Sequence, residues 1–211
     1  MFSGWRLPPP RTLAAIGIVV IVVVLAGGGV WFWMHTQSER AQATHADALA
    51  QAQAARSPQA AAAAKTAAMT ALESALAQAP DAALAAQSAY ELAGLRFDTG
   101  QYEGARAAYE IARGRASSAT MQTLAWAGIA ATWEAERNFA KAIDTYTAAV
   151  AAHQPGQFYY EDLLIGLGRS QELAGRRDDA IATYKRLLKD VPKLRREDEV
   201  RGRLASLGVS G

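Results

Sequence analysis

The chain of 211 residues contains no cysteine and only three histidines. The lack of cysteine excludes a disulfide scaffold, a cysteine-ligated zinc or iron–sulfur centre and a cysteine nucleophile. His35, His45 and His153 lie far apart in the sequence, which leaves little room for a metal site. No glycine-rich phosphate loop follows a strand. We therefore expect no metal, no cofactor, no catalytic residues and no small-molecule substrate.

An excess of charge of one sign is also missing. The 22 basic and 20 acidic residues give a net charge of only +2, which is poor evidence for nucleic-acid binding. The basic residues do concentrate toward the C-terminal end, from Arg169 onward. That end is interpreted either as a solvated capping face or as a surface that meets anionic lipid or an acidic partner. No nucleic-acid partner is expected.

One long hydrophobic run stands out. Residues 12–34 carry no charge and, as a helix of about 34 Å, would cross a hydrocarbon core of about 30 Å. Trp31 and Trp33 lie at one end of the run and Trp5 near the other, as interfacial aromatic residues do. The run predicts a retained transmembrane signal-anchor helix. A cleaved signal peptide is the alternative, although its apolar region usually spans only about 7–15 residues.

The flanks of this run predict its orientation. Arg6 and Arg11 lie on the N-terminal side without any acidic residue, and positive charge favours the cytoplasmic side. Residues 1–11 are therefore expected in the cytoplasm. The sequence predicts a single-pass protein of the bacterial inner membrane, with lipid contact through residues 12–34 and a periplasmic C-terminal domain.

The remainder of the chain contains an internal repeat. Three tyrosines recur at spacings of 37 and 38 residues, each preceded by alanine four residues earlier and by a turn residue nine residues earlier. A small alanine lets two helices approach closely, and the tyrosine fills the space beside it. The pattern predicts an all-α fold, a solenoid of helical hairpins. The repeated residues are Gly100, Ala105 and Tyr109; Arg137, Ala142 and Tyr146; and Gly175, Ala180 and Tyr184.

These residues resemble the tetratricopeptide repeat, a helix–turn–helix unit of about 34 residues. The resemblance implies units at 86–119, 123–156 and 161–194, followed by a capping helix over 195–208. Residues 35–85 look like an alanine-rich helical stalk that forms a degenerate first hairpin. A disordered alanine-rich stalk is the alternative.

The same resemblance implies roles for individual residues. In repeats of this kind, the first helix of each unit lines a concave groove that receives a partner. Carried onto this chain, the candidate groove residues are Tyr90, Phe97, Asp98, Leu124, Glu134, Ile165, Arg169 and Glu172. The residues expected to pack the repeats together are Ala105, Tyr109, Trp126, Ala142, Tyr146, Ala180 and Tyr184.

The whole arrangement also resembles a family of ancillary Sec translocon subunits and cell-division coordinators. The last hairpin carries the resemblance best, with L-G-R-S-Q-E-L-A-G-R-R-D-D-A-I-A-T-Y at its centre. The resemblance implies a membrane-anchored protein–protein interaction scaffold, a periplasmic helper of secretion, chaperone or envelope machinery. The alternative is a fixed accessory subunit that stabilises one integral-membrane complex. An enzyme would need a polar pocket with perturbed groups, for which the sequence offers no candidate.

Overall fold

The computed structural model describes residues 10–57, 59–157 and 159–209, with side chains from residue 21 onward except at residue 22. Within these ranges every regular element is an α-helix and none is a strand, which confirms the all-helical prediction. The expected cytoplasmic segment 1–11 and the first part of the expected span 12–34 fall outside the residues described with side chains. Among the fully described residues, no helix is long and apolar enough to cross a membrane.

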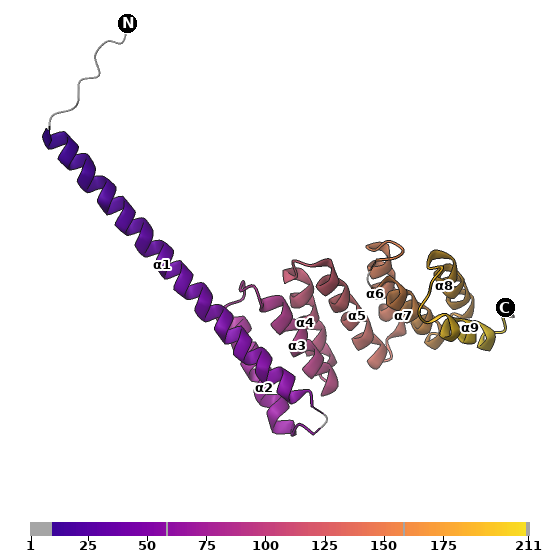
Figure 1. Cartoon of the computed structure of the whole chain (residues 1–211). Coiled ribbons are helices and arrows are strands. Elements are labelled where there is room, and N and C mark those ends of the chain that lie inside the picture. Colours follow the sequence, from indigo (N-terminus) through magenta and orange to yellow (C-terminus); the bar gives the residue numbers. More distant parts are fainter. Residues whose placement is uncertain (1–9, 58, 158, 210–211) are drawn as a thin grey trace, which may run out of the picture.

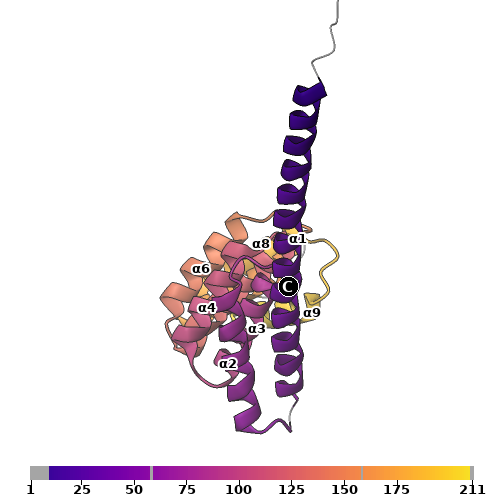
Figure 2. The ribbon, with the colours of Figure 1, turned by 90° about the vertical axis from the view of Figure 1, so that its left-hand side faces the viewer.

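The first helix, α1 (Pro10–Ala55), is one uninterrupted element of 46 residues. Figures 1 and 2 show the other helices gathered beside its C-terminal half, while its N-terminal half projects away from them. The C-terminal half buries one stripe with the three- and four-residue spacing of a helix face. The large apolar side chains between Ile21 and Met34 are instead exposed wherever they are described. The buried stripe consists of His45, Ala48, Leu49, Ala52 and Ala55.

The other helices follow α1 as a stack of hairpins. α1 and α2 form the first hairpin, three more hairpins follow, and α9 packs on α8 at the C-terminal end. The expected units 86–119, 123–156 and 161–194 each contain most of one hairpin. The elements are α2 (Ala62–Gln78), α3 (Ala85–Asp98), α4 (Tyr102–Arg115), α5 (Ala119–Ala135), α6 (Phe139–Ala151), α7 (Tyr160–Leu173), α8 (Arg177–Asp190) and α9 (Glu197–Ser206).

The first helices of successive hairpins form an inner layer. α1 packs on α3, α3 on α5 and α5 on α7, in addition to the contacts between neighbours in the chain. Within the described part of the chain, the second helices α2, α4, α6 and α8 make no comparable contacts with one another. The first helices therefore lie closer together than the second helices do. We call the surface formed by α1, α3, α5 and α7 the inner face.

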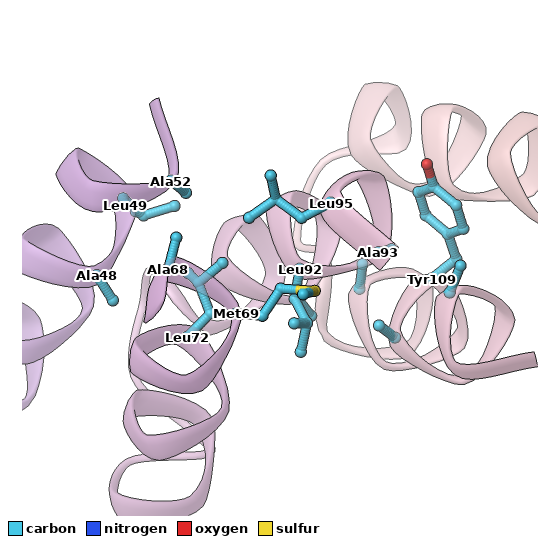
Figure 3. Close-up of a cluster of buried hydrophobic side chains, with 14 of the residues drawn as sticks. Ala48, Leu49, Ala52, Ala68, Met69, Leu72, Leu92, Ala93, Leu95 and Tyr109 are labelled. Carbon is cyan, nitrogen blue, oxygen red and sulfur yellow. The ribbon is translucent and has the colours of Figure 1, made fainter. Parts of the chain in front are cut away.

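The alanine-rich hairpin is packed. Side chains of α1, α2 and α3 belong to one buried cluster, which contains Leu49, Leu72 and Leu92 together with several alanines (Figure 3). Ala52 and Ala68 lie in the same cluster. Alanine side chains let the helix axes approach closely and also favour the helix itself. The C-terminal half of α1 therefore packs against α2 as a hairpin.

The turn inside each of the three repeats contains one residue with left-handed backbone. The φ angle is 76° at Gly100, 59° at Arg137 and 74° at Gly175. In each turn the following amide donates a 2.8 Å hydrogen bond back to a carbonyl five residues earlier, as in a Schellman motif. Glycine adopts this conformation freely, whereas a residue with a Cβ does so at a cost of about 1–2 kcal/mol. The bonds run from Gln101 to Arg96, from Asn138 to Trp133 and from Arg176 to Gln171.

Candidate functional site

A row of arginine–glutamate ion pairs runs along the inner face and joins successive repeats. Each pair links a residue near one first helix to the next first helix, or to the capping helix α9. Each pair also has a tyrosine of the internal repeat beside it, so the arrangement recurs along the stack. The nitrogen–oxygen distances are 2.8 Å for Arg56–Glu91, 2.5 Å for Arg169–Glu134 and 3.2 Å for Arg203–Glu172.

The central pair is the most completely bonded. Arg169 on α7 donates two hydrogen bonds, of 3.3 and 2.5 Å, to the carboxylate of Glu134 on α5. The Ser170 hydroxyl donates a third bond of 2.6 Å to the same carboxylate, whose side chain is only 11% exposed. Burial, together with the negative charge of Glu134, raises the pKa of Tyr146 above its usual value, although Arg169 opposes the rise. Two of the expected groove residues, Glu134 and Arg169, are thus bonded to each other.

The C-terminal pair ties the capping helix to the last repeat. The Tyr184 hydroxyl donates to the carboxylate of Glu172, and Arg203 on α9 donates to the same carboxylate at 3.2 Å. Burial and the hydrogen bond to Glu172 raise the pKa of Tyr184. Glu172 therefore lies on the inner face and also binds α9 to the last repeat through Arg203.

At the other end of the row, Arg56 follows α1 and lies over α3. An added Cβ on Gly94 would stand 2.2 Å from the Arg56 guanidinium, so the glycine leaves the room that the arginine occupies. The ring of Tyr90 meets that of Tyr109 edge-on, with centroids 5.4 Å apart. Burial, followed by the proximity of Tyr159, raises the pKa of Tyr90.

Between α3 and α5 the inner face has a different character. In the described part of the chain no ion pair joins these two helices. Phe97 occupies the repeat position that Glu134 and Glu172 hold in their units, and its ring lies edge-on to Tyr102 at 5.5 Å. Leu124 is half-buried and Asp98 is exposed. The inner face is therefore aromatic in its middle and carries paired charges on either side.

The remaining groove candidate lies in the core. Ile165 is only 2% exposed and belongs to the buried cluster of the last two hairpins. Its side chain packs the stack and presents little surface to a partner. The residue carried over from the groove pattern is thus an internal packing residue in this structure.

The residues expected to pack the repeats are buried, except that Trp126 is half-buried beneath the guanidinium of Arg113.

Each repeated tyrosine also lies directly against a glycine. A Cβ added to that glycine would come within 2.5 Å of the ring in all three cases. Two of these glycines, Gly128 and Gly166, are each the sixth residue of their unit. The ring–glycine pairs are Tyr109 with Gly128, Tyr146 with Gly166, and Tyr184 with Gly168.

Several inner-face residues were not anticipated from the sequence. Arg56, Glu91, Ser170 and Arg203 all contribute to the row of ion pairs. The sequence does carry a signal for these ion pairs, because glutamate and arginine residues recur at intervals of about one repeat length. The glycines against the tyrosine rings carried a second signal, since a helix interior usually disfavours glycine.

Two of the histidines, His45 and His153, have structural partners. His45 is fully buried, with its Nδ1 2.8 Å from the Ser88 hydroxyl and its Nε2 2.9 Å from the Ala79 carbonyl. These bonds join α1 to α3 and to the end of α2. His153 similarly bonds the Ala149 carbonyl at 2.6 Å. Among the residues that the structure describes, no three potential metal ligands come together.

Comparison with known proteins identifies one segment. A family model described as tetratricopeptide repeat matches residues 162–193, which comprise most of α7, all of α8 and the start of the connection to α9. None of the curated proteins compared with the chain matches it. The chain is therefore an all-helical repeat protein that contains a tetratricopeptide repeat. Folds of this class typically bind proteins through their extended surfaces and are not typically catalytic.

Proposed function

We propose that this protein is a membrane-anchored scaffold that binds a protein partner on the inner face of its repeat stack, and that it has no catalytic activity. The observation that carries the proposal is the aromatic patch, the stretch of the inner face between α3 and α5 where Tyr90, Phe97 and Leu124 are half-buried and no ion pair joins the two described helices. Half-buried aromatic side chains are preferred anchors in protein interfaces. The ion pairs on either side satisfy their own charges, so an incoming segment meets the patch without having to neutralise them.

The proposed anchor is the N-terminal half of α1. Trp31 and Trp33 are 67% and 63% exposed, and the described apolar residues from Ile21 to Met34 are exposed as well. Exposed large apolar side chains along a projecting helix favour burial in lipid. We propose that residues 12–34 lie in the bacterial inner membrane, with the repeat stack in the periplasm.

The proposed topology has a direct test. A reporter active only outside the cytoplasm, fused after residue 211, is expected to be active, because two arginines flank the span on its N-terminal side. The same reporter fused before residue 1 is the control and should be silent. Activity of a cytoplasm-only reporter at the C-terminal position would overturn the orientation.

The biological setting is proposed from the family resemblance. An apolar run at residues 12–34 followed by a few divergent hairpins supports a helper of secretion, chaperone or envelope machinery. A fixed accessory subunit of one integral-membrane complex is the alternative. The two differ in stoichiometry: an accessory subunit purified in mild detergent would travel as a constant member of one large complex, whereas a helper would not.

The partner site can be tested by crosslinking in intact cells. A photoreactive phenylalanine analogue at position 97 would report contacts at the aromatic patch, and the same analogue at exposed Lys185 on α8 is the matched control. Specific adducts from position 97 but not from position 185, identified by mass spectrometry, are expected. Equal adducts from both positions, or none from position 97, would contradict a binding role for the inner face.

A further inference from the structure

Arg137 stands out in the turn between α5 and α6. Its φ angle of 59° is left-handed, whereas the aligned turns use Gly100 and Gly175. Its side chain is exposed and, within the described part of the chain, forms no ion pair or hydrogen bond. The turn itself requires this backbone conformation, but no internal contact of the Arg137 side chain explains why a residue with a Cβ stands where the aligned turns have glycine.

Two further cations, Arg106 and Lys141, gather on one tryptophan near the same turn. Trp133, four residues before Arg137 on α5, has the guanidinium carbon of Arg106 3.6 Å from its ring centroid and the ammonium of Lys141 at 4.3 Å. Arg106 has a carboxylate partner, because it donates bonds of 2.6 and 3.3 Å to Glu136. Of the three cations at this turn, only Arg106 is bonded to a carboxylate in the described part of the chain.

The two other cations of this cluster lack an acidic partner. Neither Arg137 nor Lys141 forms an ion pair with any carboxylate in the described ranges, including Glu103 on α4 and Asp144 on α6. The ammonium of Lys141 rests on the half-buried ring of Trp133, which holds it in place by a cation–π contact. The cluster offers two unpaired positive charges beside an aromatic surface, which we call the Trp133 patch (Arg106, Trp133, Arg137 and Lys141).

The patch lies at the edge of the stack away from the projecting half of α1. α1 runs from that half toward the α1–α2 connection, and Figure 1 shows the α5–α6 turn at the same edge as this connection. If residues 12–34 lie in a bilayer, this edge points away from it. Lipid headgroups of the protein's own membrane are thus a poor fit, although their negative charge would suit the cations.

We propose that the Trp133 patch binds an acidic segment of a protein partner. Carboxylates of the segment would pair with the Arg137 guanidinium and the Lys141 ammonium, while an apolar side chain would contact Trp133. The proposal rests on the scaffold role proposed above, but it concerns a separate surface from the inner face. It explains why an arginine occupies a turn position that favours glycine.

Arg137→Gly provides a discriminating test, because it removes the charge and also relieves the strained turn. The full chain in non-ionic detergent is titrated into a fluorescently labelled oligo-glutamate peptide. Arg137→Gly and Lys141→Gln should each weaken binding by roughly two- to fivefold, the range typical of exposed ion pairs. The double variant should lose more than either single variant, since both side chains contact the same acidic segment. Arg137→Gly should also unfold no more easily than the parent, so lost binding cannot be ascribed to damage.

Lys185→Gln is the matched control, because it removes an exposed, unpaired lysine from α8. It should leave binding of the peptide unchanged. The proposal is wrong if the parent does not bind oligo-glutamate, or if Lys185→Gln weakens binding as much as Lys141→Gln. It is also wrong if vesicles of anionic phospholipid bind at the patch and the peptide does not. Failure of these titrations would leave crosslinking at position 97 unaffected, so the two proposals fail separately.

Discussion

The ring of Tyr146 on α6 lies directly against Gly166 on α7, where an added Cβ would stand 2.5 Å from the ring carbon Cζ. The contact joins the second repeat to the third, and Tyr109 makes the same contact with Gly128 one repeat earlier. Glycine is the only residue that leaves room for the ring at these places. The repeats are therefore held in register by a large side chain on one unit and a missing side chain on the next.

Gly166→Ala should destabilise the fold although alanine favours a helix. The methyl group would push the buried Tyr146 ring out of place, and overpacking of this kind costs about 1–3 kcal/mol. Gly202→Ala on α9 is the matched control, since no atom lies within 4 Å of its added Cβ. That change should stabilise the chain by up to about 1 kcal/mol. Urea unfolding followed by circular dichroism measures both; equal effects would contradict the ring–glycine contact.

Substitutions of Ala142 and of Tyr146 should both lower the stability of the fold, the first by adding volume to the core and the second by removing it. Ala142 is fully buried on α6, so Ala142→Leu should overpack the helix contact at a cost of about 1–3 kcal/mol. Tyr146→Ala should cost roughly 3–5 kcal/mol, as large aromatic-to-alanine changes in cores do. Ala148→Leu, at an exposed position on the same helix, is the control and should be nearly neutral. A Tyr146→Ala variant that melts like the parent would show that the repeat register is wrong.

Arg137→Gly should stabilise the protein. Glycine relieves a left-handed strain of about 1–2 kcal/mol, partly offset by the greater freedom of glycine in the unfolded chain, so the net gain should be about 0.5–1 kcal/mol. Gly175→Ala, at the aligned turn with φ of 74°, is the reverse experiment and should cost about 1 kcal/mol. Thermal melts of the full chain in detergent test both changes. A lower melting temperature for Arg137→Gly would mean that the side chain contributes to the fold itself.

Glu134→Ala should be costly because it leaves Arg169 without its carboxylate partner, while the Ser170 hydroxyl keeps its bond to the Gly166 carbonyl. We expect a loss of about 1–3 kcal/mol. The double variant with Arg169→Ala should lose less than the sum of the two single changes, since removing both partners leaves no unpaired group. Glu110→Ala breaks the more exposed pair with Arg113 and should change stability by less than about 1 kcal/mol. Strict additivity at positions 134 and 169 would contradict the bonding described for the central pair.

Alkaline pH should unfold the protein through its buried tyrosines. The pKa values of Tyr109, Tyr146 and Tyr184 are all raised, chiefly by burial. A raised pKa means that stability is complete below the unfolded value of about 10 and falls as the pH rises above it, because the unfolded chain then releases protons that the fold retains. All the arginine ion pairs persist in this range, since arginine stays charged.

The urea midpoint, measured on either side of about pH 10, should therefore be constant below that value and fall above it. Tyr146→Phe removes one ionisable phenol and should make the alkaline fall less steep. A midpoint that stays constant well above this pH would mean that the phenols ionise freely in the folded protein.

The periodicity of the sequence was enough to predict the helical hairpins. Recurrence of alanine and tyrosine at a fixed spacing identifies helices that bury one stripe, and this local pattern depends on neighbouring residues alone. The same recurrence identified the turn position at Arg137, and the structure adds that its backbone is as left-handed as that of the glycines. A turn between two packed helices requires this geometry whichever residue occupies it.

The partners of charged side chains could not be derived in this way. Glu134 and Arg169 lie 35 residues apart, and only the stacking of α5 on α7 brings them together. Likewise, Ile165 occupies a groove position by register but is buried, because the close packing in the last hairpins covers it. The sequence by itself determined the helices, their hairpin pairing and their packing stripes, since these follow from short-range spacing. The tertiary structure alone decided which charges neutralise each other and which surfaces stay open, because those depend on how successive hairpins are rotated against one another.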